Sequence, residues 1–208
     1  MLPSMNAGVD LVQAYLHLNG FLTITELPVI RAGRRGYEEV TDLDVLAVRF
    51  PWAAFTVPRG RPGPDDDLSL QLDTSLVSDQ ERVDVIIGEV KEGKPRINDT
   101  LRTEDALLTA LRRVGLGPDE ALLPVVEELQ RSGESKRDAR GGFIVPFRVR
   151  LLAFGHGKSG KRGQYSVVSL AHVAGFVENY LDRYHSVLMP SDLPEPVLGI
   201  LHLLRKLR

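Results

Sequence analysis

The sequence predicts an α/β protein in which a mixed central β-sheet is flanked by helices on both faces. Two observations support this prediction. Helical and strand-like segments follow one another in the order helix, three strands, helices, two strands and helix. The predicted strands also contain nearly continuous apolar runs, without strict alternation, and such runs are typical of strands buried on both faces.

The composition is that of a folded protein of one domain. The chain has 208 residues, of which 43% are hydrophobic and 26% are charged, and this is enough to build a sizeable core. The net charge of -2 does not indicate a nucleic-acid binder, although a local basic groove remains compatible with it. The absence of cysteine excludes disulfides and thiolate metal sites. With no signal peptide and no apolar run of roughly 20 residues, we expect a cytoplasmic protein without a membrane partner.

The first half of the chain contains the predicted first helix and three strands. Apolar residues at helical spacing predict a helix over residues 9–18, which Asn19 and Gly20 end. Three strands are expected after it, at 21–31 (ending near Pro28), 40–50 and 82–91. A turn at 31–39 joins the first two strands. A Pro, Gly and Asp-rich loop at 58–82, with one short helix around 68–76, precedes the third.

The second half is expected to be mainly helical, with two more strands. Thr103 and Gly115 have the residue types of helix caps, and Pro124 is expected to kink or split the helix that begins near Pro118. The expected elements are helices at 103–116 and 118–133, a polar linker at 132–142, strands at 143–155 and 164–170 joined by a hairpin, a helix at 170–188 capped by Ser169, and an amphipathic tail at 197–208. We therefore expect one domain over residues 1–190, with 58–82 as a loop insertion, and a C-terminal helical tail over 191–208 that packs on the domain or on a second subunit.

Two charged residues stand at the end of the apolar strand at 82–91. Glu89 and Lys91 share one face of this strand, because strand side chains alternate, and Val90 faces the other way. Burying an unpaired charge is costly, so these side chains require each other, solvent or a ligand. Asp44 lies at the polar end of the preceding strand. If the two strands are antiparallel neighbours, Asp44 and Glu89 converge at one edge of the sheet.

These residue types are suited to binding a hard metal ion. Two carboxylates, from Asp44 and Glu89, and the backbone carbonyl of Val90 would form an oxygen site for Mg²⁺ or Mn²⁺. Such a metal lowers the pKa of a bound water and neutralises charge on a phosphate. An adjacent lysine, here Lys91, can hold the attacking water or stabilise the developing negative charge.

The arrangement resembles the PD-(D/E)XK nuclease superfamily, which has the restriction-endonuclease-like fold. The matching stretches are "TDLDVLAVRF" and "VDVIIGEVK", and the resemblance covers roughly residues 9–115 and, more loosely, 147–188. It implies an αβββαβ core and metal-dependent hydrolysis of phosphodiester bonds, in DNA in the first place and alternatively in RNA. It further implies that Asp44 and Glu89 are metal ligands and that Lys91 is the catalytic lysine.

Some features depart from the family pattern or leave alternatives open. Leu43 stands where the proline of the motif would precede Asp44, while a literal Pro64-Asp65 pair lies in the loop. Asp42 shares a face with Asp44 and is its closest competitor. Members of the family can add a carboxylate or glutamine from a flanking element, and the candidates here are Gln13, Glu39 and Glu104.

The remaining alternatives concern partners and activity. Lys158, Lys161 and Arg162 form a basic hairpin that either contacts a nucleic-acid backbone or is simply a solvated turn. The chain is alternatively a catalytically inactive nuclease-like module that binds nucleic acid or a protein partner, or an unrelated α/β protein in which Glu89 pairs with Lys91. Enzymes of this fold often pair subunits to cut two strands, which makes a homodimer plausible.

Overall fold

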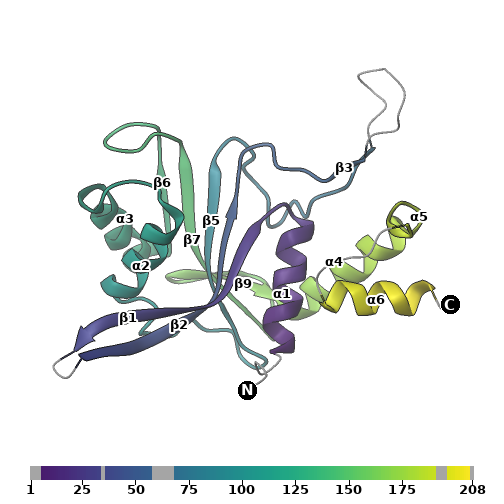
Figure 1. The fold of residues 1–208 in the computed structure, drawn as a ribbon, viewed down its shortest axis with the longest axis horizontal. Coiled ribbons are helices and arrows are strands. Elements are labelled where there is room, and N and C mark those ends of the chain that lie inside the picture. Colours follow the sequence, from purple (N-terminus) through teal and green to yellow (C-terminus); the bar gives the residue numbers. More distant parts are fainter. Residues whose placement is uncertain (1–5, 34–35, 58–67, 191–195, 207–208) are drawn as a thin grey trace.

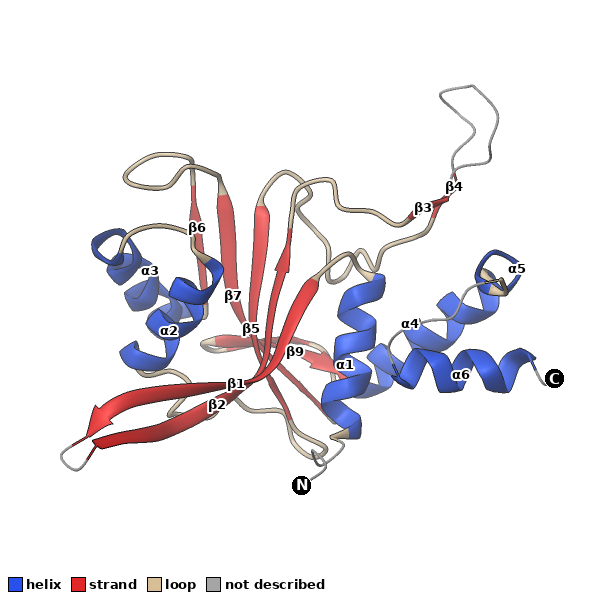
Figure 2. Cartoon of the chain, in the orientation of Figure 1, coloured by secondary structure: helices blue, strands red, loops and turns tan. Residues whose placement is uncertain are grey.

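A mixed, seven-stranded β-sheet with helices on both faces forms the centre of the protein, as the sequence predicts (Figures 1 and 2). The computed structural model describes residues 6–33, 36–57, 68–190 and 196–206. The strands of the large sheet are β1 (Leu22–Gly33), β2 (Gly36–Arg49), β5 (Val83–Val90), β6 (Glu134–Arg137), β7 (Phe147–Gly155), β8 (Gly160–Arg162) and β9 (Tyr165–Ser169). The short strands β3 (Thr56–Val57) and β4 (Leu68–Ser69) form a separate two-stranded sheet.

Six helices surround the sheet: α1 (Ala7–Leu18), α2 (Glu104–Val114), α3 (Asp119–Ser132), α4 (Leu170–Arg183), α5 (His185–Leu188) and α6 (Pro196–Lys206). Figure 1 shows α2 and α3 on one side of the sheet and α1, α4 and α6 on the other. None of the helices in the described part of the chain has the length and apolar character needed to span a membrane.

The strand order of the sheet is β1-β2-β5-β7-β9-β8, and β6 pairs with β7. Strands β1, β2 and β5 are antiparallel neighbours, whereas β5, β7 and β9 run parallel. The first half of β7 pairs with β6 and its second half pairs with β9, so these two strands share one side of β7. The chain therefore reaches β7 from β5 through α2 and α3, as a parallel crossover requires.

The two faces of β5 belong to two separate hydrophobic clusters. Val85 and Ile87 pack in the cluster that α2 and α3 cover, whereas Ile86 and Val90 pack in the cluster beneath α1 and α4. All eight residues of β5 are buried. Full burial of each such side chain contributes about 1.5–3 kcal/mol, which explains why this strand reads as a continuous apolar run.

The β1–β2 hairpin differs from the prediction because β1 does not stop near Pro28. The strand pair continues to Gly33 and Gly36, so most of the predicted turn at 31–39 is strand. Since β1 is the edge strand of the sheet, the missing N–H of Pro28 costs no ladder bond to a further strand. Figure 1 shows the hairpin projecting beyond the body of the sheet.

The prediction for the strands in the second half of the chain is wrong in two respects. Strands β7 and β9 are parallel, with Leu152 opposite Ser166, so no hairpin joins them directly. The hairpin is instead β8–β9, because the chain first forms β8 at the outer edge and then returns as β9 between β7 and β8. The predicted polar linker at 132–142 also contains β6, whose charged residues pair with β7.

The part of the long loop that the structure describes is held by polar contacts and does not form the predicted helix around 68–76. It contains β4 and a turn at residues 74–76. The carboxylate of Asp73 accepts a hydrogen bond from Tyr15 Oη at 2.7 Å and lies 2.6 Å from His172 Nε2. These bonds attach the loop to α1 and α4 and fix a non-helical backbone. Pro64 and Asp65 lie outside the described residues.

The helix predictions hold with corrections at individual residues. Gly115 ends α2 in the left-handed conformation, with φ of 75°, as predicted. Thr103 occupies the N-cap position, but its hydroxyl donates to the carbonyl of Thr100 instead of capping the helix. Pro124 lies inside a continuous α3, and the helix predicted over 170–188 is interrupted at Tyr184. The tail packs on the domain, because α6 contacts α1 and α4 and buries Leu198.

Candidate active site

The candidate active site lies where β2 and β5 run side by side. The two strands are antiparallel, with Val45 opposite Gly88. Continuing this register by one residue places Asp44 opposite Glu89, and continuing it by three places Asp42 opposite Lys91. Cross-strand partners project from the same face of a sheet. Glu89 and Lys91 therefore share the face of Val85 and Ile87, which α2 and α3 cover, and Asp44 lies across from Glu89.

The side chains of Asp44, Glu89 and Lys91 meet at this point. The Lys91 ammonium lies 2.6 Å from Glu89 Oε1 and 3.8 Å from Asp44 Oδ2. Only 5% of the Glu89 side chain and 14% of the Asp44 side chain is exposed, against 38% for Lys91. The structure thus brings together the three residues that the sequence singles out, and the lysine is the most exposed of them.

Burial and charge alter the protonation of this cluster. Burial raises the pKa of Glu89, the hydrogen bond from Lys91 acts against it, and the negative charge of Asp44 raises it further. Burial acts to lower the pKa of Lys91, but its bond to Glu89 and the charges of Glu89, Asp44 and Asp42 raise it overall. The site therefore holds a firmly charged ammonium next to a carboxylate that resists ionisation, and such perturbed groups are typical of functional sites.

Val90 orients Asp44 through its backbone. The N–H of Val90 donates to Asp44 Oδ2 at 2.7 Å, while the N–H of Lys91 donates to the Phe154 carbonyl on the other side of the strand. Because the N–H and C=O of one strand residue point to the same side, the Val90 carbonyl is also directed toward β2. The side chain of Val90 packs in the cluster beneath α1. A role for the carbonyl as a metal ligand stays a prediction.

The loop that follows β5 supplies a further contact that sequence reasoning missed. The backbone N–H of Asn98 hydrogen bonds to the Glu89 carboxylate. The loop is anchored by Ile97 and Leu101, both buried, and it crosses β7 at Gly155, where a Cβ would lie 2.9 Å from backbone atoms. A backbone N–H is present in every residue type except proline, so the sequence gives no sign of this contact. Only the apolar residues Ile97 and Leu101 could have indicated that the loop is held in place.

The alternative residues are distributed over both faces of the sheet. Asp42 is exposed and influences the pKa of Lys91. Glu104 begins α2, the helix on the same face as Glu89, whereas Gln13 lies on α1 and donates to the hydroxyl of Thr23. Glu39 is exposed in the β1–β2 hairpin. Asp42 is therefore the alternative whose charge is shown to act on Lys91.

The basic hairpin lies away from this cluster. Strand β8 is three strand positions from β5, about 14 Å at the usual spacing of strands. Lys161 is opposite Ser166, which in turn is opposite Leu152, so Lys161 projects from the face that α4 covers and Glu89 from the other. Lys158 and Arg162 are exposed. Their contact with nucleic acid stays a prediction.

Asp44 and Glu89 are the carboxylates able to hold a metal in this cluster. The residues described contain no group of three or more His, Cys, Asp or Glu side chains that could hold a metal ion. The ammonium of Lys91, however, already lies against both carboxylates, where a cation would be stabilised. Since part of the raised pKa of Glu89 comes from the charge of Asp44, added positive charge would favour ionisation of Glu89. Two carboxylates completed by water and a backbone carbonyl are ligand types that a hard divalent cation takes, and a metal at this site stays a prediction.

Comparison of the chain with protein-family models, with curated proteins and with solved structures found no match. The class of protein must therefore be argued from the sheet and from this cluster.

Proposed function

We propose that the protein is a metal-dependent nuclease of the restriction-endonuclease-like class, which hydrolyses phosphodiester bonds of DNA or, alternatively, RNA. The convergence of Asp44, Glu89 and Lys91 at the end of two antiparallel strands carries this proposal. The two carboxylates are largely buried, and the lysine beside them is more exposed.

The order of elements supports the same proposal. Helix α1, the antiparallel strands β1, β2 and β5, helix α2 and the parallel strand β7 follow one another as in an αβββαβ core. Strands β3 and β4 lie between β2 and β5, and β4 falls within the 58–82 stretch that was expected to be an insertion. Helix α3 and strand β6 lie between α2 and β7.

The chain's own residues have separate roles in the proposed reaction. Asp44 and Glu89 would hold Mg²⁺ or Mn²⁺, which when bound lowers the pKa of water and neutralises charge on the phosphate. The N–H groups of Val90 and Asn98 keep the two carboxylates in place. Lys91 is the most exposed of the three side chains, and its flexible ammonium can leave Glu89 to hold the attacking water or the phosphate oxygens.

A second candidate function is a catalytically inactive module of the same fold, which binds nucleic acid or a protein partner. The 2.6 Å contact between Lys91 and Glu89 favours it, because this ion pair neutralises the buried carboxylate without a metal. Such a module would neither cleave nucleic acid nor bind Mg²⁺ at this site.

The test is cleavage of supercoiled plasmid, single-stranded DNA and RNA in Mg²⁺, Mn²⁺ or EDTA. We expect metal-dependent cleavage that Asp44→Asn, Glu89→Ala and Lys91→Ala each reduce by at least about a hundredfold. Glu120→Gln is the control, because it removes an exposed carboxylate in the first turn of α3 that has no proposed role, and it should retain activity. Undiminished metal-dependent cleavage by Glu89→Ala would contradict the assignment of the site. If the wild-type protein cleaves none of these substrates and calorimetry detects no Mg²⁺ binding, the inactive module is the correct class.

A further inference from the structure

A polar pocket opens on the face of the sheet opposite the candidate active site. Its volume is about 340 Å³, and it lies between β7, β8, β9 and the loop before β5. Three cationic side chains line it, those of Arg148, Arg150 and Lys161. No carboxylate is among its lining residues in the part of the chain that the structure describes.

The register of the strands gathers these cations on one face. Arg148 is opposite Asp84 on β5, and Lys161 is opposite Ser166, which is opposite Leu152. This is the face beneath α1 and α4, where Ile86 and Leu152 are in the hydrophobic cluster. Glu89 projects from the other face, so the pocket and the carboxylate cluster are separated by the sheet itself.

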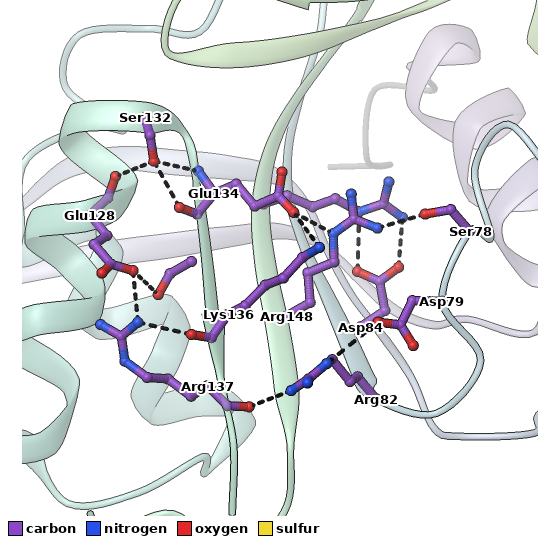
Figure 3. A network of polar contacts seen from close by, with 12 residues as sticks. Ser78, Asp79, Arg82, Asp84, Glu128, Ser132, Glu134, Lys136, Arg137 and Arg148 are labelled. Carbon is purple, nitrogen blue, oxygen red and sulfur yellow. Dashed lines mark hydrogen bonds and ion pairs between the residues drawn. The ribbon is translucent and has the colours of Figure 1, made fainter.

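Arg150 is buried, Arg148 is largely so, and both are held in position before any ligand arrives. The side chains of Arg148 and Arg150 are 13% and 8% exposed. Figure 3 shows Arg148 between Glu134 and Ser78, and its bonds to them are 2.8 and 2.9 Å long. Arg150 binds Asp84 through two hydrogen bonds and also donates to the Leu76 carbonyl. Guanidinium groups fixed in this way lose little entropy on binding a further acceptor.

The positive charge of the pocket is not fully balanced. Asp84 and Glu134 are each paired with one arginine, but the Lys161 ammonium donates to a neutral group, the Ser132 carbonyl, at 2.6 Å. Lys161 also lines an adjoining groove with two further cations, Arg131 and Lys136. Of these, Lys136 lies 3.6 Å from Glu134, which already binds Arg148. The single negative charge of Glu134 is therefore shared between two cations. The pocket and its groove together keep a surplus of positive charge.

Serine hydroxyls supply neutral donors to the same space. The hydroxyls of Ser78 and Ser159 accept hydrogen bonds from Arg148 and from the N–H of Ser169, so each keeps its own hydrogen for donation. Both serines line the pocket, together with Ser166. Fixed guanidinium groups, an ammonium and hydroxyl donors form the usual environment of a phosphate group in proteins.

We propose that this pocket binds a phosphate group. An anion with several oxygens can accept from the serine hydroxyls and from Lys161 while it lies over the paired arginines. The group belongs either to a small phosphorylated ligand or to a nucleic-acid backbone, and the chemistry of recognition is the same for both. The proposal does not rest on nuclease activity, because the two sites use different residues on opposite faces of the sheet.

The primary test is titration of the ¹⁵N-labelled full chain with inorganic phosphate in EDTA, followed by two-dimensional NMR. Sodium chloride of equal ionic strength is the reference. We expect amide shifts to concentrate at Ser78, Ser159 and Ser166 at phosphate concentrations up to about 10 mM. Lys161→Ala should weaken binding about tenfold, since it removes one charged donor, and Lys161→Arg should restore most of it. Arg113→Ala removes an exposed cation on α2 and should leave phosphate binding unchanged.

The second arm identifies the source of the phosphate, using a short single-stranded DNA in EDTA. Shifts at the same serines, weakened by Lys161→Ala, would assign the pocket to a nucleic-acid backbone. Phosphate binding without such a response to DNA would assign it to a small phosphorylated ligand. The proposal is overturned if phosphate produces no more change than sodium chloride, or if the folded Lys161→Ala protein binds phosphate as the wild type does. Because neither variant removes Arg148 or Arg150, the buried ion pairs stay intact in every arm.

Discussion

Removing Asp84 tests how strongly burial increases the contribution of an ion pair to stability. Arg150 donates from Nε and Nη2 to the two carboxylate oxygens of Asp84, at 3.1 and 2.6 Å. The side chains are 8% and 1% exposed. Burial lowers the pKa of Arg150 and raises that of Asp84, and the opposite charge of each partner acts against the shift. Each charge therefore depends on the other for its stabilisation.

We expect Asp84→Ala to reduce the free energy of unfolding by about 3–5 kcal/mol, because it leaves the Arg150 guanidinium buried without its bidentate partner. For a chain of this length, the midpoint of thermal unfolding should fall by roughly 6–20 °C. Urea unfolding followed by circular dichroism measures the loss of free energy. An unchanged slope of this free energy against urea concentration shows that the substitution does not alter the surface exposed on unfolding.

The chain contains a matched control with the same geometry at the surface. Arg112 donates from Nε and Nη2 to the two oxygens of Asp119, at 2.8 and 2.6 Å, and both side chains are about half exposed. Water replaces the lost partner in Asp119→Ala, so its effect on unfolding should be far smaller. If Asp84→Ala destabilised the protein no more than Asp119→Ala, the reasoning that burial sets the strength of the pair would be refuted.

Two further predictions concern the candidate active site. Burial raises the pKa of Glu89 in the folded protein above its unfolded value of about 4.3, so stability should fall as pH rises through the interval between the two values. Glu89→Gln removes this titration, so the free energy of unfolding, measured in urea at a series of pH values, should decline less steeply with pH. The same steepness in the variant and the wild type would contradict the raised pKa of Glu89. Gly155→Ala places a Cβ 2.9 Å from the backbone of Pro95 and should cost about 1–3 kcal/mol, measured by urea unfolding. Gly175→Ala on α4 should cause no loss, because the added Cβ would meet no atom within 4 Å other than those of its own helix. Equal effects of the two changes would argue against a tight crossing of the loop.

Most of the correct prediction of the candidate site came from residues that are close together in the sequence. Alternation along one strand placed Glu89 and Lys91 on a common face, and the antiparallel pairing of β2 with β5 added Asp44. The contribution of Asn98 could not be predicted, because any residue other than proline offers the same backbone N–H. The sequence also could not predict that Lys161 lies away from this cluster, because its position depends on the order of β7, β9 and β8 in the sheet.

The errors in the fold arose where local patterns were compatible with more than one pairing. Apolar runs at 143–155 and 164–170 indicated two strands, yet nothing local distinguished antiparallel neighbours from the parallel pair that forms. The charged stretch of β6 reads as a linker, because its strand conformation depends on hydrogen bonds to β7. In the loop before β5, the contacts of Asp73 with Tyr15 and His172 replaced the expected helix, and these partners are far apart in the chain.

The sequence by itself determined the class of fold, the capping of α2 at Gly115 and the shared face of Glu89 and Lys91, because each follows from backbone geometry within a few residues. Only the tertiary structure decided which strands became neighbours. That choice depends on packing and hydrogen bonds between distant segments, and it places one charged cluster on each face of the sheet. On one face it joins Asp44 to Glu89, and on the other it joins Arg148 to Lys161 and the serines.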